Sequence, residues 1–201
     1  MERAPTGAPR GASLAETLVV VAVLGLSLPL ALPVVAELGG ATGLRAASNH
    51  VAAHLNRARG LAAARGRDVG IRWVLAGGDA TLYFYEDGNW NGVLSADVVA
   101  GVDRLVAGPI SLRGRYPSIR FSFVPGFRGP DPGGSPIGDL SDPFRLGASN
   151  ITTFSPVGKA SPGTVYLSDE RSRQAAVRVS PYSARIQVYE WRPSSRTWEP
   201  E

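Results

Sequence analysis

An uncharged apolar run near the amino terminus constrains this chain more than any other feature. From Thr17 to Ala36 there are 20 consecutive residues without a charged side chain, most of them Val, Leu or Ala. As a helix, such a run spans about 30 Å, the thickness of the hydrocarbon core of a bilayer. Arg3 and Arg10 precede it, and positive residues before an apolar run favour keeping that end in the cytoplasm. The sequence therefore predicts an amino-terminal segment that inserts into a membrane.

Three kinds of segment fit this pattern, and they differ in where the chain is cut. A secretory signal would be cut before Glu37, because Val34-Val35-Ala36 places small residues at the right positions, although the run is longer than the usual 7–15 or so residues. A plain anchor would stay uncut. A prepilin-type signal would be cut after Gly11.

Glu16 separates these readings, because a carboxylate at the edge of an apolar run costs free energy unless it is paired or lies at the headgroup level. After a cut behind Gly11, the new ammonium group of Ala12 lies four residues before Glu16. Among parallel helices, that ammonium can pair with Glu16 of a neighbouring subunit. The segment thus resembles the class III signal of type IV pilins and type II secretion pseudopilins, with Ala12 where Phe or Met is usual. The resemblance implies a prepilin peptidase cut between Gly11 and Ala12, N-methylation of Ala12, an assembly role for Glu16 and a helix-kinking proline at Pro33.

A second helical stretch is predicted beyond the weak point at Gly39-Gly40. It should end near Arg65-Gly66, where glycine can supply a left-handed cap. Steps of three and four residues place its apolar side chains on one stripe that would pack on a sheet: Leu44, Ala47, Val51, Leu55, Ala58 and Ala62.

The rest of the chain has the alternating pattern of β-strands. Val165 and Leu167 alternate with Tyr166, which is typical of an antiparallel sheet with one solvated face. Residues 125–150, with 6 Gly and 5 Pro, predict a long mobile loop. Strands are predicted at 68–75, 80–86, 103–106, 110–112, 119–124, 151–155, 164–168, 175–180 and 184–190.

This layout resembles the H-type minor pseudopilins and their pilus-tip relatives (the GspH/FimT group). Phe154-Ser155-Pro156-Val157-Gly158 matches the group's F-S-P-x-G turn, and Gly163-Thr164-Val165 matches its next strand. The resemblance implies an α+β fold of the type IV pilin kind, with a long hydrophobic amino-terminal helix packed on an antiparallel β-sheet domain. It implies a leader at 1–11, a helix at 12–66 (membrane or filament-core part 14–36, amphipathic part 41–66) and a periplasmic β-rich domain at 67–201.

The same resemblance implies a non-enzymatic minor pseudopilin of the type II protein secretion pseudopilus, without cofactor or metal. A minor type IV pilin for pilus assembly or DNA uptake is the alternative. Expected partners are other pseudopilins or pilins, the prepilin peptidase, the inner-membrane assembly platform and the lipid bilayer. The chain would be a single-pass protein of the bacterial inner membrane.

Two motifs could carry metal chemistry instead. His50 and His54 have the i, i+4 spacing of a two-histidine site, but Val51 stands where a metalloprotease needs Glu, so we interpret them as surface or groove histidines. Asp87, Asn89 and Asn91 resemble the start of a calcium loop, although Val98 occupies the position of the closing Glu. A turn stabilised by Asn and Asp side chains is the favoured interpretation, with a calcium loop as the alternative.

The carboxy-terminal region is rich in arginine, interleaved with aromatic residues. Such a pattern can bind a nucleic-acid backbone and stack bases. We interpret it as the solvated face of a terminal hairpin and do not expect nucleic acid as a partner, since Ala184-Arg185-Ile186-Gln187 lacks the G-R-x-R element of DNA-uptake pilins in this group. The arginines are Arg171, Arg173, Arg178, Arg185, Arg192 and Arg196.

Overall fold

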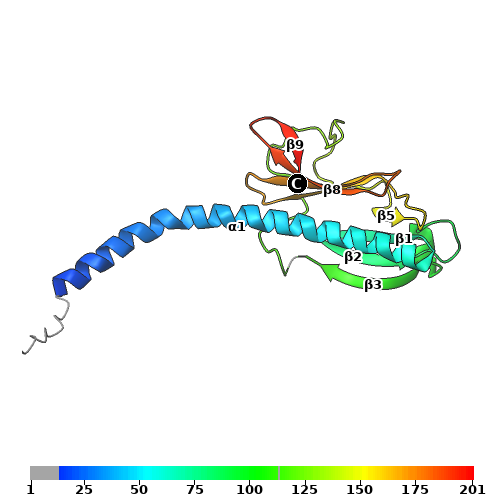
Figure 1. Ribbon diagram of the computed structural model, residues 1–201, viewed down its shortest axis with the longest axis horizontal. Coiled ribbons are helices and arrows are strands. Elements are labelled where there is room, and N and C mark those ends of the chain that lie inside the picture. Colours follow the sequence, from blue (N-terminus) through cyan, green and yellow to red (C-terminus); the bar gives the residue numbers. More distant parts are fainter. Residues whose placement is uncertain (1–13, 113) are drawn as a thin grey trace, which may run out of the picture. The chain divides into compact units, whose positions relative to one another are not determined.

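The computed structural model describes residues 14–112 and 114–201, leaving aside the side chains of residues 24–41. The chain divides into two compact units, Met1–Gly39 and Gly40–Glu201, and each is described by itself. Its elements follow the order α1 (Leu14–Arg65), β1 (Val69–Ala76), β2 (Asp79–Glu86), α2 (Ser95–Ala100), β3 (Arg104–Ser111), β4 (Phe144–Arg145), β5 (Ile151–Phe154), β6 (Gly163–Ser168), β7 (Gln174–Val179), β8 (Ile186–Arg192) and β9 (Thr197–Pro200) (Figure 1).

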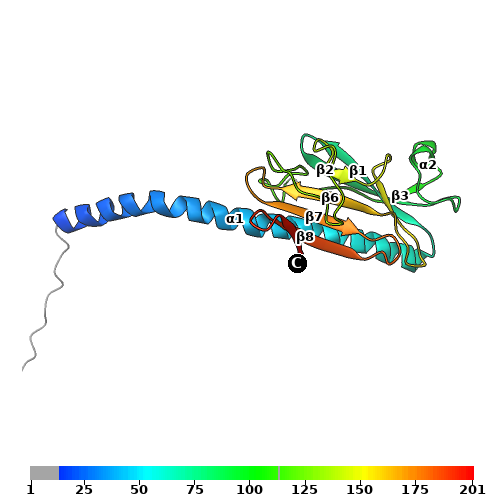
Figure 2. The same cartoon turned by 90° about the horizontal axis from the view of Figure 1, so that it is seen from above.

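The carboxy-terminal part of α1 runs along the strands of the second unit (Figures 1 and 2). All six residues of the predicted apolar stripe are buried, and none is more than 3% exposed. Ser48 is fully buried within the same stripe. The helix ends at Arg65, and Gly66 has a φ of 64°, as expected for a left-handed cap. The prediction for this half of the helix is confirmed.

The first sheet is antiparallel and has the strand order β3-β2-β1-β5. β1 and β2 form a hairpin in which Val69 lies opposite Glu86 and Ala76 opposite Asp79. Gly77 and Gly78 both have positive φ, which suits the primed turns that match the twist of a hairpin. β3 is a single strand, where the sequence predicted two short ones at 103–106 and 110–112.

The second sheet, also antiparallel, has the strand order β4-β6-β7-β8-β9. β6, β7 and β8 correspond to predicted strands, whereas the short strands β4 and β9 and the helix α2 were not predicted. α2 buries none of its residues.

The predicted strand at 119–124 is wrong, because its backbone bonds to both sheets in turn. Arg120 exchanges two hydrogen bonds with Ser168 of the second sheet, and the N–H of Phe121 donates to Gly78 in the first hairpin. The N–H of Val124 donates to the side chain of Gln174. A segment that divides its hydrogen bonds in this way forms no continuous ladder.

One hydrophobic core joins α1 and both sheets. It contains Val51 and Leu55 from α1, Ile71 and Phe84 from the first sheet and Val177 from the second, all fully buried. Trp73 takes part and donates its indole N–H to Thr152 at 3.2 Å. Since neither sheet could bury its apolar face alone, the helix and the two sheets fold as one unit.

A second, aromatic cluster covers the other face of the second sheet. Tyr166 is fully buried there, and Phe127 enters from the loop at 125–150 to pack on Trp191 and Trp198, with ring centroids 5.1 and 6.0 Å apart. The indole of Trp198 donates to the carbonyl of Pro130 at 2.7 Å. The expectation of a solvated face at Tyr166 is therefore wrong, because this loop packs over that face.

The predicted fold class needs correction. α1 is long, but its described residues do not form a long apolar helix, and the strands form two antiparallel sheets where a single β-sheet domain was expected. Among the described residues, no helix is both long enough and apolar enough to cross a lipid bilayer. The leader 1–11 lies outside the described residues, and most side chains of the predicted span 17–36 lie outside them too.

The stripe of α1 supplies a test of the shared core. Replacing Leu55 by Ala should lower the free energy of unfolding by about 2–5 kcal/mol, because Leu55 is fully buried between the helix and the sheets. Urea denaturation of the full chain, followed by tryptophan fluorescence, measures the change. Val99→Ala is the matched control, since Val99 is 80% exposed on α2 and should shift stability by no more than about 0.5 kcal/mol. Equal effects of the two substitutions would contradict the packing described above.

Candidate functional site

The amino-terminal end of α1 exposes apolar side chains in every direction. Glu16 lies in the first helical turn, where the helix dipole favours an acidic residue, and it is the only charged residue between Leu14 and Val23. The consecutive residues Leu18–Val21 are each more than half exposed. Since successive side chains point about 100° apart around a helix, four in a row cover its whole circumference. A helix that is apolar all round is normally buried.

The other predicted assembly and processing residues are described less fully. Gly11 and Ala12 lie outside the described residues. Pro33 falls within α1, but its side chain lies outside the described part. Of the four, the structure therefore places the side chain of Glu16 alone.

The two histidines stack on each other beside the shared core. The ring centroids of His50 and His54 are 4.6 Å apart, with 28° between the ring planes. Tyr116 approaches His50 edge-on, and Phe84 approaches His54 in the same way. No group of three or more His, Cys, Asp or Glu side chains that could hold a metal occurs in the described part of the chain. The pair fits the groove interpretation, in which the imidazoles serve packing.

The pKa of both imidazoles is lowered. Burial, the neighbouring His50 and Arg57 lower the pKa of His54 to about 4. Burial and Arg115 lower the pKa of His50 from its ordinary value. Among the residues that the structure describes, Nδ1 of His50 and Nε2 of His54 have no hydrogen-bond partner, which adds to the cost of a charge at this place.

The acidic loop at 86–103 is closed by its own hydrogen bonds. Asp87 is 3% exposed, and its Oδ1 accepts the backbone N–H groups of Asn89 and Trp90 at 2.9 Å each, while Oδ2 accepts that of Gly92 at 3.0 Å. Asp103 accepts the N–H groups of Gly88 and Leu94 in the same way. The interpretation as a turn stabilised by Asp and Asn side chains is confirmed.

Side-chain hydrogen bonds and a cation–π contact also stabilise this loop. Oδ2 of Asp97 accepts the side-chain amides of Asn89 and Asn91, at 3.3 and 2.8 Å. The guanidinium of Arg67 lies 4.1 Å from the centre of the Trp90 ring, a cation–π contact. Burial and the nearby Asp87 raise the pKa of Asp68. Both carboxylate oxygens of Asp87, the first residue of the calcium-like stretch, are thus bound to protein N–H groups.

The carboxy-terminal arginines do not form one surface. Arg192 pairs with Glu190 at 3.5 Å and with Glu199 at 2.8 Å. Arg178 lies against Gly133 of the loop, and Arg185 lines a hollow beside α1. Most of the aromatic residues that alternate with these arginines in sequence, such as Trp191, belong to the aromatic cluster on the second sheet. That nucleic acid is not a partner stays a prediction.

Arg171 and Arg196 meet a third arginine that sequence reasoning missed. Arg128, from the loop at 125–150, lines the same hollow of about 540 Å³. Residue 128 is far in sequence from the two turns that carry the other arginines, so no spacing rule could have joined them. The folding of the loop over the second sheet brings the three together.

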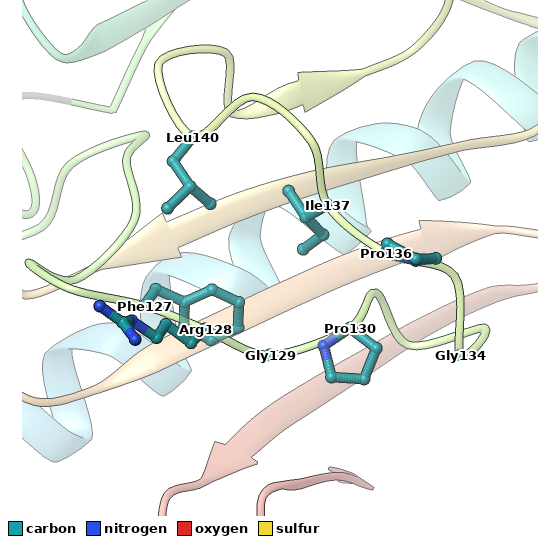
Figure 3. Close-up of a pocket in the computed structure, with 8 residues that line it drawn as sticks. All are labelled: Phe127, Arg128, Gly129, Pro130, Gly134, Pro136, Ile137 and Leu140. Carbon is teal, nitrogen blue, oxygen red and sulfur yellow. The ribbon is translucent and has the colours of Figure 1, made fainter.

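The same loop encloses a second hollow of about 440 Å³, which is lined mainly by apolar side chains and backbone. Figure 3 shows Ile137 and Leu140 on one limb of the loop and the segment from Phe127 to Pro130 on the other. Its lining contains no carboxylate, imidazole or hydroxyl group that could do chemistry. The lining residues are Phe127, Arg128, Gly129, Pro130, Gly134, Pro136, Ile137 and Leu140.

The pKa of His54 predicts a pH dependence of stability. In the unfolded chain a histidine takes up a proton near pH 6.5, whereas folded His54 does so only near pH 4. The unfolded state therefore binds more protons between these values, and stability falls as the pH falls through this window. After allowance for solvent screening of the half-buried ring, we expect a loss of about 1–2 kcal/mol. Urea denaturation at pH 7 and pH 4.5 measures it, and His54→Gln should reduce the loss. An unchanged pH dependence in this variant would contradict the assignment.

The Asp87 loop predicts a large difference between two neighbouring carboxylates. Asp87→Ala should lower the free energy of unfolding by about 2–3 kcal/mol, since it leaves three backbone N–H groups without their acceptor. Asp97→Ala is the control, and should cost no more than about 1 kcal/mol because the amides that it accepts are exposed. Thermal unfolding of the full chain measures both. Equal losses would show that the loop does not depend on Asp87.

No protein-family model, curated protein or solved structure matches this chain in the comparisons made.

Proposed function

We propose that this chain is a minor pseudopilin, a non-enzymatic structural subunit of the type II secretion pseudopilus. A prepilin peptidase cuts it between Gly11 and Ala12, and Ala12 is then N-methylated. Until assembly the subunit is held in the bacterial inner membrane, with its β-rich unit in the periplasm. Its partners are other pseudopilins and the inner-membrane assembly platform.

The exposed apolar start of α1 is the observation that carries this proposal. Leu14 is 83% exposed, and Leu18, Val19, Val20, Val21 and Val23 are each 52–66% exposed. At about 25 cal/mol for each Å² of apolar surface, leaving such a segment in water is costly, so it requires cover from outside the chain. Side-by-side packing with the corresponding segments of other subunits gives that cover.

Glu16 gives the packed segments a register. A carboxylate among apolar helices is stabilised only by a nearby positive charge or hydrogen-bond donor. The amino group created by the cut at Gly11 lies four residues before Glu16, about one helical turn away. A neighbour shifted by one turn therefore brings its own amino group level with Glu16. The pairing supports a filament, since each subunit then offers one charge of each sign.

The amino terminus of the protein extracted from its native membranes tests the processing step. We expect mass spectrometry to find a chain that begins at N-methyl-Ala12. Glu16→Ala should leave the cut in place but reduce incorporation into filaments at least about tenfold, because it removes the paired charge. Glu170→Ala, at an exposed turn, is the matched control and should assemble normally. A chain starting at Glu37 or Met1, or normal assembly of Glu16→Ala, would refute the proposal.

The neighbours of the subunit decide between a secretion pseudopilus and a type IV pilus. The chain has no cysteine, so Val19→Cys introduces a single thiol on the exposed face of α1. Oxidative cross-linking through this thiol to cysteine-substituted candidate subunits, followed by mass spectrometry, identifies the partner. Cross-links to secretion pseudopilins support the proposal, whereas cross-links to pilus subunits alone would contradict it.

A further inference from the structure

One loop and two turns beside the second sheet line an open hollow that contains three arginines. The loop that begins at Pro125 supplies Arg128, the β6–β7 turn supplies Arg171, and the β8–β9 turn supplies Pro193 and Arg196. Its volume, about 540 Å³, falls within the range of ligand pockets. All three arginine side chains belong to exposed residues. The hollow is open to a ligand from outside.

The positive charge of this hollow is not balanced within the described part of the chain. None of Arg128, Arg171 and Arg196 forms an ion pair there, whereas Arg192 on the adjoining strand has two. Oδ1 of Asp169, on the same turn as Arg171, accepts three backbone N–H groups at 2.9 Å each. Three like charges around one hollow repel one another, and an anionic ligand relieves that repulsion.

The residues that line the hollow suit some classes of anionic ligand better than others. Trp191 and Phe127 are 9% and 5% exposed and pack edge to face against each other, so neither ring offers a face on which a base could stack. Arg178, Arg185 and Arg192 lie against different parts of the second unit, so these three of the described residues form no continuous stripe that could follow a nucleic-acid backbone. The exposed rings of Pro125 and Pro193 instead give small apolar surfaces between the guanidinium groups.

We infer that this hollow binds an acidic peptide segment of a partner protein, with carboxylates on the arginines and one apolar side chain against the prolines. The planar guanidinium group of arginine matches a carboxylate with two parallel hydrogen bonds. Three arginines from three separate turns suit carboxylates that lie at different points of an extended segment. This inference goes beyond the filament role and would hold if that role proved wrong, because it depends only on the second unit.

Fluorescence anisotropy with a labelled peptide tests the assignment on the full-length protein in a mild detergent. The probe is acetyl-Gly-Asp-Glu-Leu-Glu-Asp-Gly, and its neutral counterpart carries an amide in place of each side-chain carboxylate. We expect the acidic peptide to bind and the neutral one to bind at least about tenfold more weakly. Raising the salt from about 50 to about 300 mM should weaken binding severalfold, since the charges are exposed.

Substitutions locate the binding. The double variant Arg128→Gln/Arg171→Gln should lose at least about tenfold in affinity, and Arg196→Gln should lose less. Arg185→Gln is the matched control, because it removes the same charge from an exposed position beside α1. An equal loss in this control, or no binding of the acidic peptide, would overturn the inference. Tighter binding of a twelve-nucleotide oligothymidylate that depends on Arg128 would also overturn it, in favour of a nucleic-acid site.

Discussion

The second unit depends on the contact of one helix stripe with two sheets at once. Leu44, Val51 and Leu55 of α1 lie in the same core as Ile71 and Phe84 of the first sheet and Val165 and Val177 of the second. Three of the stripe residues are alanines, and these are buried just as completely. Small side chains let the helix backbone approach the strands, while the larger ones fill the space between the sheets. The four-stranded sheet and the five-stranded sheet share this core. Neither sheet could therefore keep its apolar face covered if the helix were displaced.

The parts of this arrangement that were predictable are those fixed by local pattern. The steps of three and four along α1, the glycine after Arg65 and the positions of strands β1, β2, β6 and β7 each depend on a few neighbouring residues, and the structure agrees with them. The errors arose from contacts between distant segments. The residues at 119–124 alternate like a strand, yet they bond to Gly78, Ser168 and Gln174 in succession. Tyr166 alternates like a residue of a half-solvated sheet, yet Phe127 and its loop cover it. The local periodicity of a strand does not indicate whether a distant loop will pack over one of its faces.

The candidate sites also divide into those that local sequence pattern predicts and those that depend on contacts between distant segments. The turn at Asp87 was foreseeable, because Asp and Asn side chains commonly bond to backbone N–H groups two or three residues ahead. The packing of His50 on His54 follows from their helical spacing. The meeting of Arg128 with Arg171 and Arg196 was not foreseeable, since it depends on how a glycine- and proline-rich loop folds back over a sheet. A search of the sequence for charge runs finds only the carboxy-terminal arginines, and the structure separates most of those from one another.

The loop over the second sheet has a consequence for how the protein opens. Between residues 125 and 142 its backbone makes few hydrogen bonds, among them the one from the N–H of Asp131 to the carbonyl of Ser135, and this part of the loop is attached largely through aromatic rings and the indole of Trp198. Segments with few backbone hydrogen bonds tend to detach at a lower free energy than the core beneath them. The outer aromatic layer can therefore separate while the inner core stays closed. Because Trp191 and Trp198 lie in the outer layer and Trp73 in the inner one, the protein carries a separate optical reporter for each of these two events.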